Sequence, residues 1–215
     1  ALPEFTRRYP LIELDLRLND RIVDLVAERV DVALRVGPIR QAGLAARRVS
    51  QVNIVTCAAP AYLQDHGEPK TPDELREHKL VGLTSPSGAP PEWTFPPPYT
   101  PKRLGLKFSM LFNAAEAPII AATAGLGITH TGDLLVAEYV GRGELKLILE
   151  DFVMPGPPIS LVYPSAGHQL AKVRVFSDFA ADLLLRWNEV VRRWIKQPSR
   201  LPNPVAAASS APLVR

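Results

Sequence analysis

Residues 12–36 read IELDLRLNDRIVDLVAERVDVALRV and decide the fold class of the chain. Apolar and polar residues alternate over residues 12–18, which predicts a half-buried strand. Asp20 can cap a helix over residues 22–30, where apolar residues recur every three to four positions. Residues 31–36 form a second, mostly apolar strand signal. A strand, a helix and a strand in this order predict a parallel βαβ unit and therefore an α/β fold.

The rest of the chain continues this alternation of strands and helices. We expect strands at 47–57, 80–83, 104–112, 128–131, 144–149 and 159–163, and helices beginning at Asn113 and Asp133 and covering 173–194. Proline-rich stretches at 86–101 and 155–158 interrupt the middle of the chain. If the last strand and helix pack back on the first βαβ unit, residues 1–56 and 159–196 form one lobe. Residues 57–158 then form a second lobe.

The charge of the chain is unevenly distributed. The 215 residues carry a net charge of +3, but residues 1–188 hold 20 Lys and Arg against 21 Asp and Glu. The basic excess therefore lies near the C-terminus, and the folded part has no composition that favours binding to phosphates. Residues 197–215 lack periodicity and predict a disordered tail. No apolar run approaches the roughly 18 residues of a membrane span, so we expect no membrane contact.

Patterns that carry catalysis or metal binding are weak. The single cysteine, Cys57, lies in an apolar strand, which favours a buried, inert thiol and fits a cytoplasmic location. The four histidines include no pair at metal-ligand spacing, and Ser165 is not in a Gly-x-Ser-x-Gly turn. Gly125 and Gly127 follow a predicted helix, so they end it and do not form a nucleotide-binding loop. We therefore expect no enzyme, no cofactor and no metal.

One candidate ligand contact lies at the end of the 31–36 strand. Ligands in open α/β sheets bind beyond the carboxyl ends of strands, and clefts between lobes are common ligand sites. Arg35 stands there, just before Gly37, and its guanidinium suits a carboxylate. The alternative is a structural ion pair between Arg35 and Asp31.

The other candidates follow two later strands. Asn113 is expected to cap a helix whose free N–H groups favour an anion. Phe112 beside it is either a pocket wall or part of the core. Thr129 and His130 follow a tight turn and are expected near the mouth of the cleft.

A series of short segments, found in order along the chain, also points to a known family. They are residues 5–10, 31–37, 59–63, 66–75, 93–95, 124–128, 143–145, 162–164 and 172–176. Together they resemble the effector-binding domain of LysR-type transcriptional regulators over about residues 2–187. The resemblance implies the fold of type-2 periplasmic binding proteins, with two lobes, an effector cleft between them and side-by-side dimerisation.

The function that this resemblance implies is the sensing of a small effector, without catalysis, in a bacterial cytoplasm. The partners would be the effector, further copies in a homodimer or homotetramer, and DNA. DNA would be contacted only through an N-terminal winged helix-turn-helix, for which this chain has no counterpart. The strand that precedes the first helix in this family, and often contacts the effector, has no counterpart either. A solute-binding protein of a transporter and, with less support, a small enzyme on the same fold are the alternatives.

Overall fold

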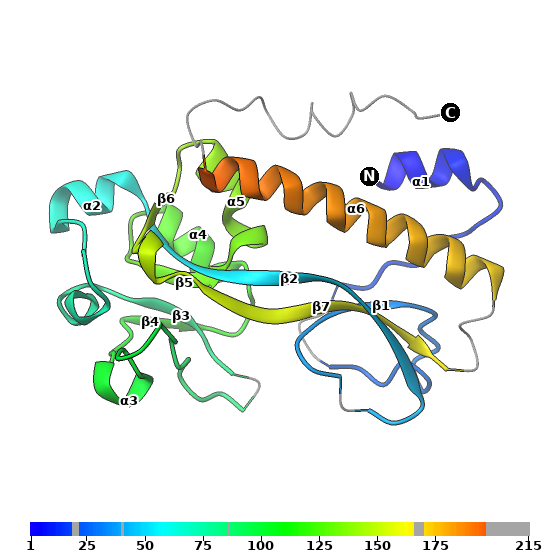
Figure 1. Cartoon of the computed structure of the whole chain (residues 1–215), viewed down its shortest axis with the longest axis horizontal. Coiled ribbons are helices and arrows are strands. Elements are labelled where there is room, and N and C mark those ends of the chain that lie inside the picture. Colours follow the sequence, from blue (N-terminus) through cyan, green and yellow to red (C-terminus); the bar gives the residue numbers. More distant parts are fainter. Residues whose placement is uncertain (19–21, 40, 86, 166–169, 197–215) are drawn as a thin grey trace. The chain divides into compact units, whose positions relative to one another are not determined.

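The computed structural model describes residues 1–18, 22–39, 41–85, 87–165 and 170–196. They form two compact units (Figure 1). Unit 1 contains Ala1–Gln51 and Pro157–Val190. Unit 2 contains Val52–Gly156 and the described residues from Val191 onward. The chain therefore passes between the units within two long strands, β2 (Leu44–Ala58) and β7 (Met154–Pro164), and once more near the end of α6 (Ala171–Lys196).

Unit 1 is built on aromatic packing between its first and last helices. It contains α1 (Leu2–Arg8), β1 (Ala33–Val36) and most of α6 (Ala171–Lys196). Phe5 of α1 is completely buried, and its ring centroid lies 5.4 Å from Phe176 and 5.0 Å from Phe179 of α6. Phe176 and Phe179, on the helix predicted over 173–194, thus bury Phe5.

Unit 2 holds most of the short elements. They are α2 (Pro60–His66), the 3-10 helix η1 (Pro72–Glu77), β3 (Val81–Leu83), α3 (Pro101–Leu104), β4 (Met110–Phe112), α4 (Ala117–Thr123), β5 (Thr129–Gly132), α5 (Asp133–Gly141), β6 (Lys146–Ile148) and the 3-10 helix η2 (Glu150–Phe152). Two groups of buried side chains fill this unit. One gathers around Tyr62, Leu75 and Trp93, and the other around Cys57 and Ile119.

Strand pairing is mostly antiparallel. In the larger sheet, the order is β1-β7-β2-β5, and β6 also pairs with β2. Strand β1 is antiparallel to β7, and β2 is antiparallel to β5, with Thr56 opposite His130. Strands β3 and β4 form a separate parallel pair, and a parallel bridge joins Leu80, just before β3, to Ile128, just before β5.

The predicted βαβ unit at the start of the chain is wrong. Residues 12–18 form no strand, and residues 25–29 form turns in place of a helix. Leu18 is 99% exposed and Ile22 is 78% exposed, so these apolar side chains are not buried in a core. A strand also needs a partner to satisfy its backbone, and no described residue pairs with 12–18. The predicted cap Asp20 lies outside the described residues.

Later predictions fare better. Strands occur at or close to five of the predicted positions, as β2, β3, β5, β6 and β7. The strand predicted over 104–112 is reduced to residues 110–112: residue 104 ends α3, and residues 105–109 belong to neither a helix nor a strand. The last helix is confirmed and longer than predicted. The predicted disordered tail, residues 197–215, lies outside the described part of the chain.

Candidate functional site

Two parallel strands of unit 2 end side by side. Leu83, the last residue of β3, is paired with Phe112, the last residue of β4. Thr84 follows β3, and both its backbone N–H (2.7 Å) and its hydroxyl (3.0 Å) donate to the Phe112 carbonyl oxygen. Asn113 is the first residue after β4, and it is exposed. Thr84 was not predicted as a site residue from the sequence, although its position as a hydroxyl residue directly after a predicted strand was an available signal.

Asn113 does not cap a helix. Helix α4 begins at Ala117, its cap position is Glu116, and residues 113–116 form bends and turns. Pro118 fixes this start, because proline is tolerated in the first turn of a helix but not deeper in it. The prediction that Asn113 caps a helix is therefore wrong, and the helix starts four residues further along the chain. The amide side chain of Asn113, directly after β4, is nevertheless exposed.

Phe112 is a half-buried part of the second core group. Its ring packs against the group that contains Cys57 and Ile119. Its carbonyl is held by Thr84, so both its side chain and its backbone are fixed. Of the two alternatives for Phe112, the core contact is the one that the structure contains.

Thr129 and His130 lie on β5, against β2. Thr129 is 1% exposed, and the His130 ring shares a 2.9 Å hydrogen bond between its Nδ1 and the Thr56 hydroxyl. The His130 ring also packs between Trp93, at 5.2 Å between ring centroids, and Phe95, at 4.6 Å. Desolvation by this burial lowers the pKa of His130 to about 4, although the Thr94 backbone opposes the shift. His130 is therefore neutral at pH 7.

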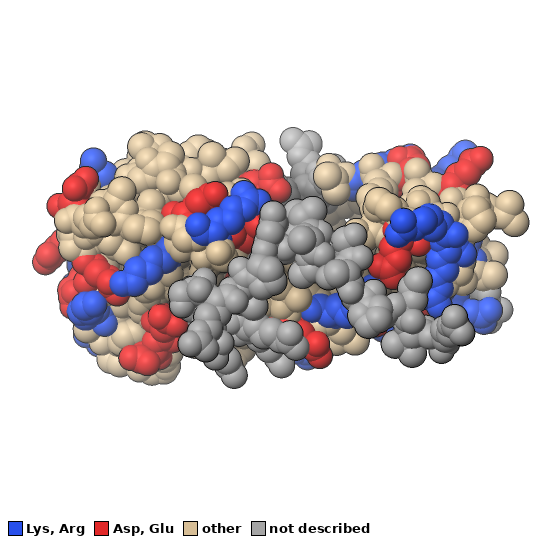
Figure 2. Space-filling model, turned by 90° about the horizontal axis from the view of Figure 1, so that it is seen from above, with Lys and Arg blue, Asp and Glu red and all other residues tan. Residues whose placement is uncertain are grey.

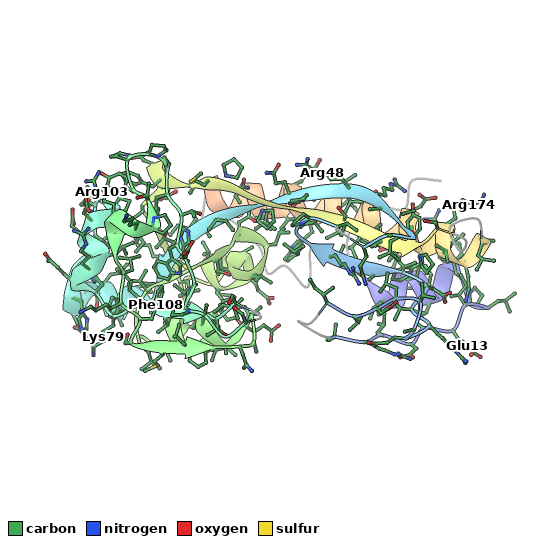
Figure 3. All side chains as sticks on the ribbon, turned by 90° about the horizontal axis from the view of Figure 1, so that it is seen from below. Glu13, Arg48, Lys79, Arg103, Phe108 and Arg174 are labelled. Atoms are coloured by element: carbon green, nitrogen blue, oxygen red, sulfur yellow. The ribbon has the colours of Figure 1, made fainter. Side chains whose placement is uncertain are left out.

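The aromatic cluster around His130 extends to the loop before β4. Phe108, labelled in Figure 3, packs edge-on against Trp93 with 5.3 Å between ring centroids. A Cβ atom on Gly82 would lie 2.8 Å from the Pro91 ring and 2.9 Å from Phe108. Gly82 in the middle of β3 thus lets these side chains close over the strand.

Arg35 and Gly37 lie in unit 1. The Arg35 guanidinium donates to the Gln41 side-chain oxygen at 2.7 Å and to the Val23 carbonyl. The alternative of an ion pair with Asp31 is not found: the Asp31 carboxylate binds Lys172 at 2.7 Å. Gly37 has a φ of 112° and donates its N–H to the Pro158 carbonyl at 2.9 Å. Glycine suits this position, because other residues rarely adopt such a φ.

The six predicted residues thus fall into two groups. Phe112 and Asn113 lie beside Thr84 at the end of the parallel pair, and the bridge from Leu80 to Ile128 links β3 to the start of β5. Thr129 and His130 therefore belong to the same unit as Asn113, whereas Arg35 and Gly37 belong to the other.

Other kinds of site find little support in the described residues. They contain no group of three or more His, Cys, Asp or Glu side chains that could hold a metal ion. None of the helices described is long and apolar enough to cross a membrane. Cys57 is completely buried, and desolvation raises the pKa of its thiol to about 12. Figure 2 shows basic and acidic side chains interspersed on the face that it draws.

Comparison with known proteins identifies the family. Residues 1–185 match the LysR substrate binding domain. The HTH-type transcriptional regulator CrgA of Neisseria meningitidis is 32% identical over 184 residues, which cover 84% of this chain and 60% of CrgA. An uncharacterised HTH-type transcriptional regulator of Haemophilus influenzae is 30% identical over 172 residues, covering 80% of this chain and 59% of that protein. The chain therefore spans about three fifths of the length of these relatives.

Solved structures agree with the sequence match. The CrgA regulatory domain superposes with a TM-score of 0.77 at 29% identity, covering 85% of this chain and 89% of that domain. The full-length virulence activator AphB of Vibrio cholerae gives a TM-score of 0.66 at 28% identity, covering 85% of this chain and 62% of AphB. The expected two-lobed α/β fold is thereby confirmed. The chain belongs to the LysR substrate-binding domain family and is the effector-binding domain of a LysR-type regulator.

Proposed function

We propose that this domain senses a small, anionic effector. The proposed contacts are Arg35 and Gly37 from unit 1 and Phe112, Asn113, Thr129 and His130 from unit 2. The observation that carries the proposal is the parallel pair β3–β4, whose ends place Thr84 and Asn113 side by side. Ligands of α/β proteins bind at such carboxyl ends.

The charges of these residues favour a ligand with a single negative group. Arg35 is the only cation among the six, and its guanidinium has five N–H donors, so its two bonds to Gln41 and Val23 leave others for a carboxylate. His130 adds no positive charge at pH 7 because of its low pKa. Asn113 and Thr84 offer neutral polar groups. A small carboxylate with a neutral body fits this set better than a polyanion.

The parts of the protein that act on DNA would lie outside this chain. Its relatives are named as HTH-type transcriptional regulators and are longer than the region that it matches. We infer that effector binding changes the arrangement of the two units, and that homodimer or homotetramer contacts pass the change to an N-terminal helix-turn-helix domain. The protein would act in the cytoplasm and would not be an enzyme.

The test is calorimetry on the full-length regulator with a panel of small carboxylates. Arg35→Ala and Asn113→Ala should each weaken the best ligand about tenfold or more, because a hydrogen bond to a charged group is worth about 1.5–3 kcal/mol. Gln64→Ala, on the exposed face of α2, is the control and should bind like the parent. The site assignment is wrong if a carboxylate binds and neither substitution weakens it. The ligand class is wrong if no carboxylate binds while an uncharged or cationic compound does.

A further inference from the structure

Strand β2, which connects the two units, is hydrogen-bonded to α5 through Asn53 and Asp133, directly after it enters unit 2. Asn53 is the second residue of β2 in this unit. Its backbone N–H donates to Asp133 Oδ1 at 3.1 Å, and its side-chain Nδ2 donates to Asp133 Oδ2 at 2.7 Å. Both oxygens of one carboxylate thus bind the same residue of the connecting strand.

Asp133 is unusual for an acidic residue at the start of a helix. It is the first residue of α5 and only 3% exposed. Its Oδ1 also accepts the backbone N–H of Leu134 at 2.8 Å. An acid in the first turn commonly stays in water, where its gain from the helix dipole is modest. Burying a carboxylate is costly unless donors surround it, and here two of the three donors come from β2, 80 residues away.

Two glycines also allow other strands to pack closely against Val52 and Ile54, the neighbours of Asn53 on β2. A Cβ atom on Gly132 would lie 2.7 Å from Val52 Cγ1. A Cβ atom on Gly156, the last residue of unit 2 on β7, would lie 2.8 Å from Ile54 Cδ1 and 3.2 Å from the Val52 carbonyl oxygen. Glycines at both positions therefore let β5 and β7 close on β2 where it enters the unit.

We propose that Asn53 and Asp133 are a positioning pair that fixes the point at which β2 becomes part of unit 2. The residues from Val52 onward then move with α5 and β5. On the two connecting strands, bending between the units is then confined to the part of β2 before Val52 and to the residues of β7 after Gly156. Helix α6, which enters unit 2 at Val191, is a third connection. The proposal rests on the proposed function only in giving this bending a role in effector sensing.

Charge-swapped variants of the full chain test the pair without any ligand. Asn53→Asp places two carboxylates face to face and removes the amide donor. The double substitution Asn53→Asp/Asp133→Asn puts an amide back opposite a carboxylate. Gln64→Glu, which adds the same charge on the exposed face of α2, is the matched control.

Two measurements report on the pair. The first is amide hydrogen exchange of the β2 peptide. The second is the distribution of distances between spin labels at Lys102→Cys on α3 in unit 2 and Arg174→Cys on α6 in unit 1 (Figure 3), in a Cys57→Ala background. Asn53→Asp should speed exchange at residues 52–54 about tenfold or more and broaden the distance distribution. The double substitution should restore both, and the control should change neither.

A distance distribution that stays narrow in Asn53→Asp would overturn the proposal. If Asn53→Asp lowers the unfolding midpoint but leaves the distance distribution as narrow as that of the parent, the pair is only structural. If that variant does not fold, Asn53→Ala, which keeps the backbone bond to Asp133, decides by the same two measurements. No ligand is present, so a failure of carboxylates to bind would count against the proposed function alone.

Discussion

The Thr56 hydroxyl and the His130 ring face each other across the β2–β5 ladder and share a 2.9 Å hydrogen bond. Trp93 and Phe95 pack around the same ring. This burial favours the uncharged form of the ring. The pair therefore couples the stability of the domain to pH.

We expect the domain to lose stability as the pH falls from about 6.5 to 4. The pKa of His130 is lowered from 6.5 to about 4 in the folded chain, so between these values the unfolded chain binds the proton more readily. The stabilisation by neutral His130 is complete above pH 6.5 and lost as the pH falls through about 4, a difference on the order of 3 kcal/mol. Urea unfolding at pH 7, 5.5 and 4.5 measures it.

Comparison with variants separates His130 from the carboxylates that titrate in the same range. His130→Gln should flatten the fall in unfolding free energy between pH 6.5 and 4.5. His66→Gln, on the exposed face of α2, should keep the slope of the parent. Equal slopes for the parent and His130→Gln would show that His130 does not carry the effect.

Cys57 should be unreactive while the domain is folded. Its side chain is completely buried, and the pKa of about 12 leaves almost no thiolate, the form that reacts, at pH 7–8. A disulfide reagent such as DTNB should label the native chain only at the rate of its unfolding and label one thiol at once in 6 M guanidinium. Rapid stoichiometric labelling in native buffer would contradict the burial of Cys57.

Long apolar patterns allowed much of the fold to be predicted from the sequence. Strand β2 and helix α6 each extend over 15 residues or more, so their patterns are clear. Strand β7 was predicted only over 159–163, because its first residues fall in the proline-rich stretch 155–158 that was read as an interruption. The pattern of residues 12–18 was equally clear but misleading. Alternation says which faces a strand would have, and it cannot say whether a partner strand is present to pair with it.

The site was harder to predict because its contacts join distant residues. Pro118 carried enough information to reject Asn113 as a cap, because a proline in the first turn requires a start close to residue 117. The bond from Asn53 to Asp133 spans 80 residues and has no local signal. Burial of His130 depends on the proline-rich loop that carries Trp93 and Phe95, which has no regular structure of its own.

The aromatic contact between α1 and α6 should dominate the stability of unit 1. Phe5→Ala removes a fully buried ring that touches Phe176 and Phe179, and should cost about 3–5 kcal/mol of unfolding free energy. Leu2→Ala on the same helix, where the side chain is 45% exposed, should cost no more than about 0.5 kcal/mol. Urea unfolding followed by circular dichroism distinguishes them. Similar costs for the two variants would mean that α1 does not pack on α6 in solution.

Alanine substitutions at Gly125 and Gly127, the two glycines after α4, should lower the unfolding free energy by different amounts. A Cβ atom on Gly127 would overlap the Lys79 carbonyl oxygen, which accepts the Ile128 N–H at 2.9 Å. Gly127→Ala should therefore break the bridge between Leu80 and Ile128 and cost at least about 2 kcal/mol.

Gly125→Ala is the matched control, because Gly125 has a φ of 76° and no atom lies within 4 Å of its added Cβ. Only the backbone strain remains there, which costs about 1 kcal/mol. Urea unfolding followed by Trp fluorescence gives both values. Because the bridge joins β3 to the start of β5, Gly127→Ala should also speed hydrogen exchange at Val81, whose N–H donates to Ile128. Equal stability of the two variants, with Val81 still protected, would show that the backbone at Gly127 does not lie so close to the Lys79 carbonyl.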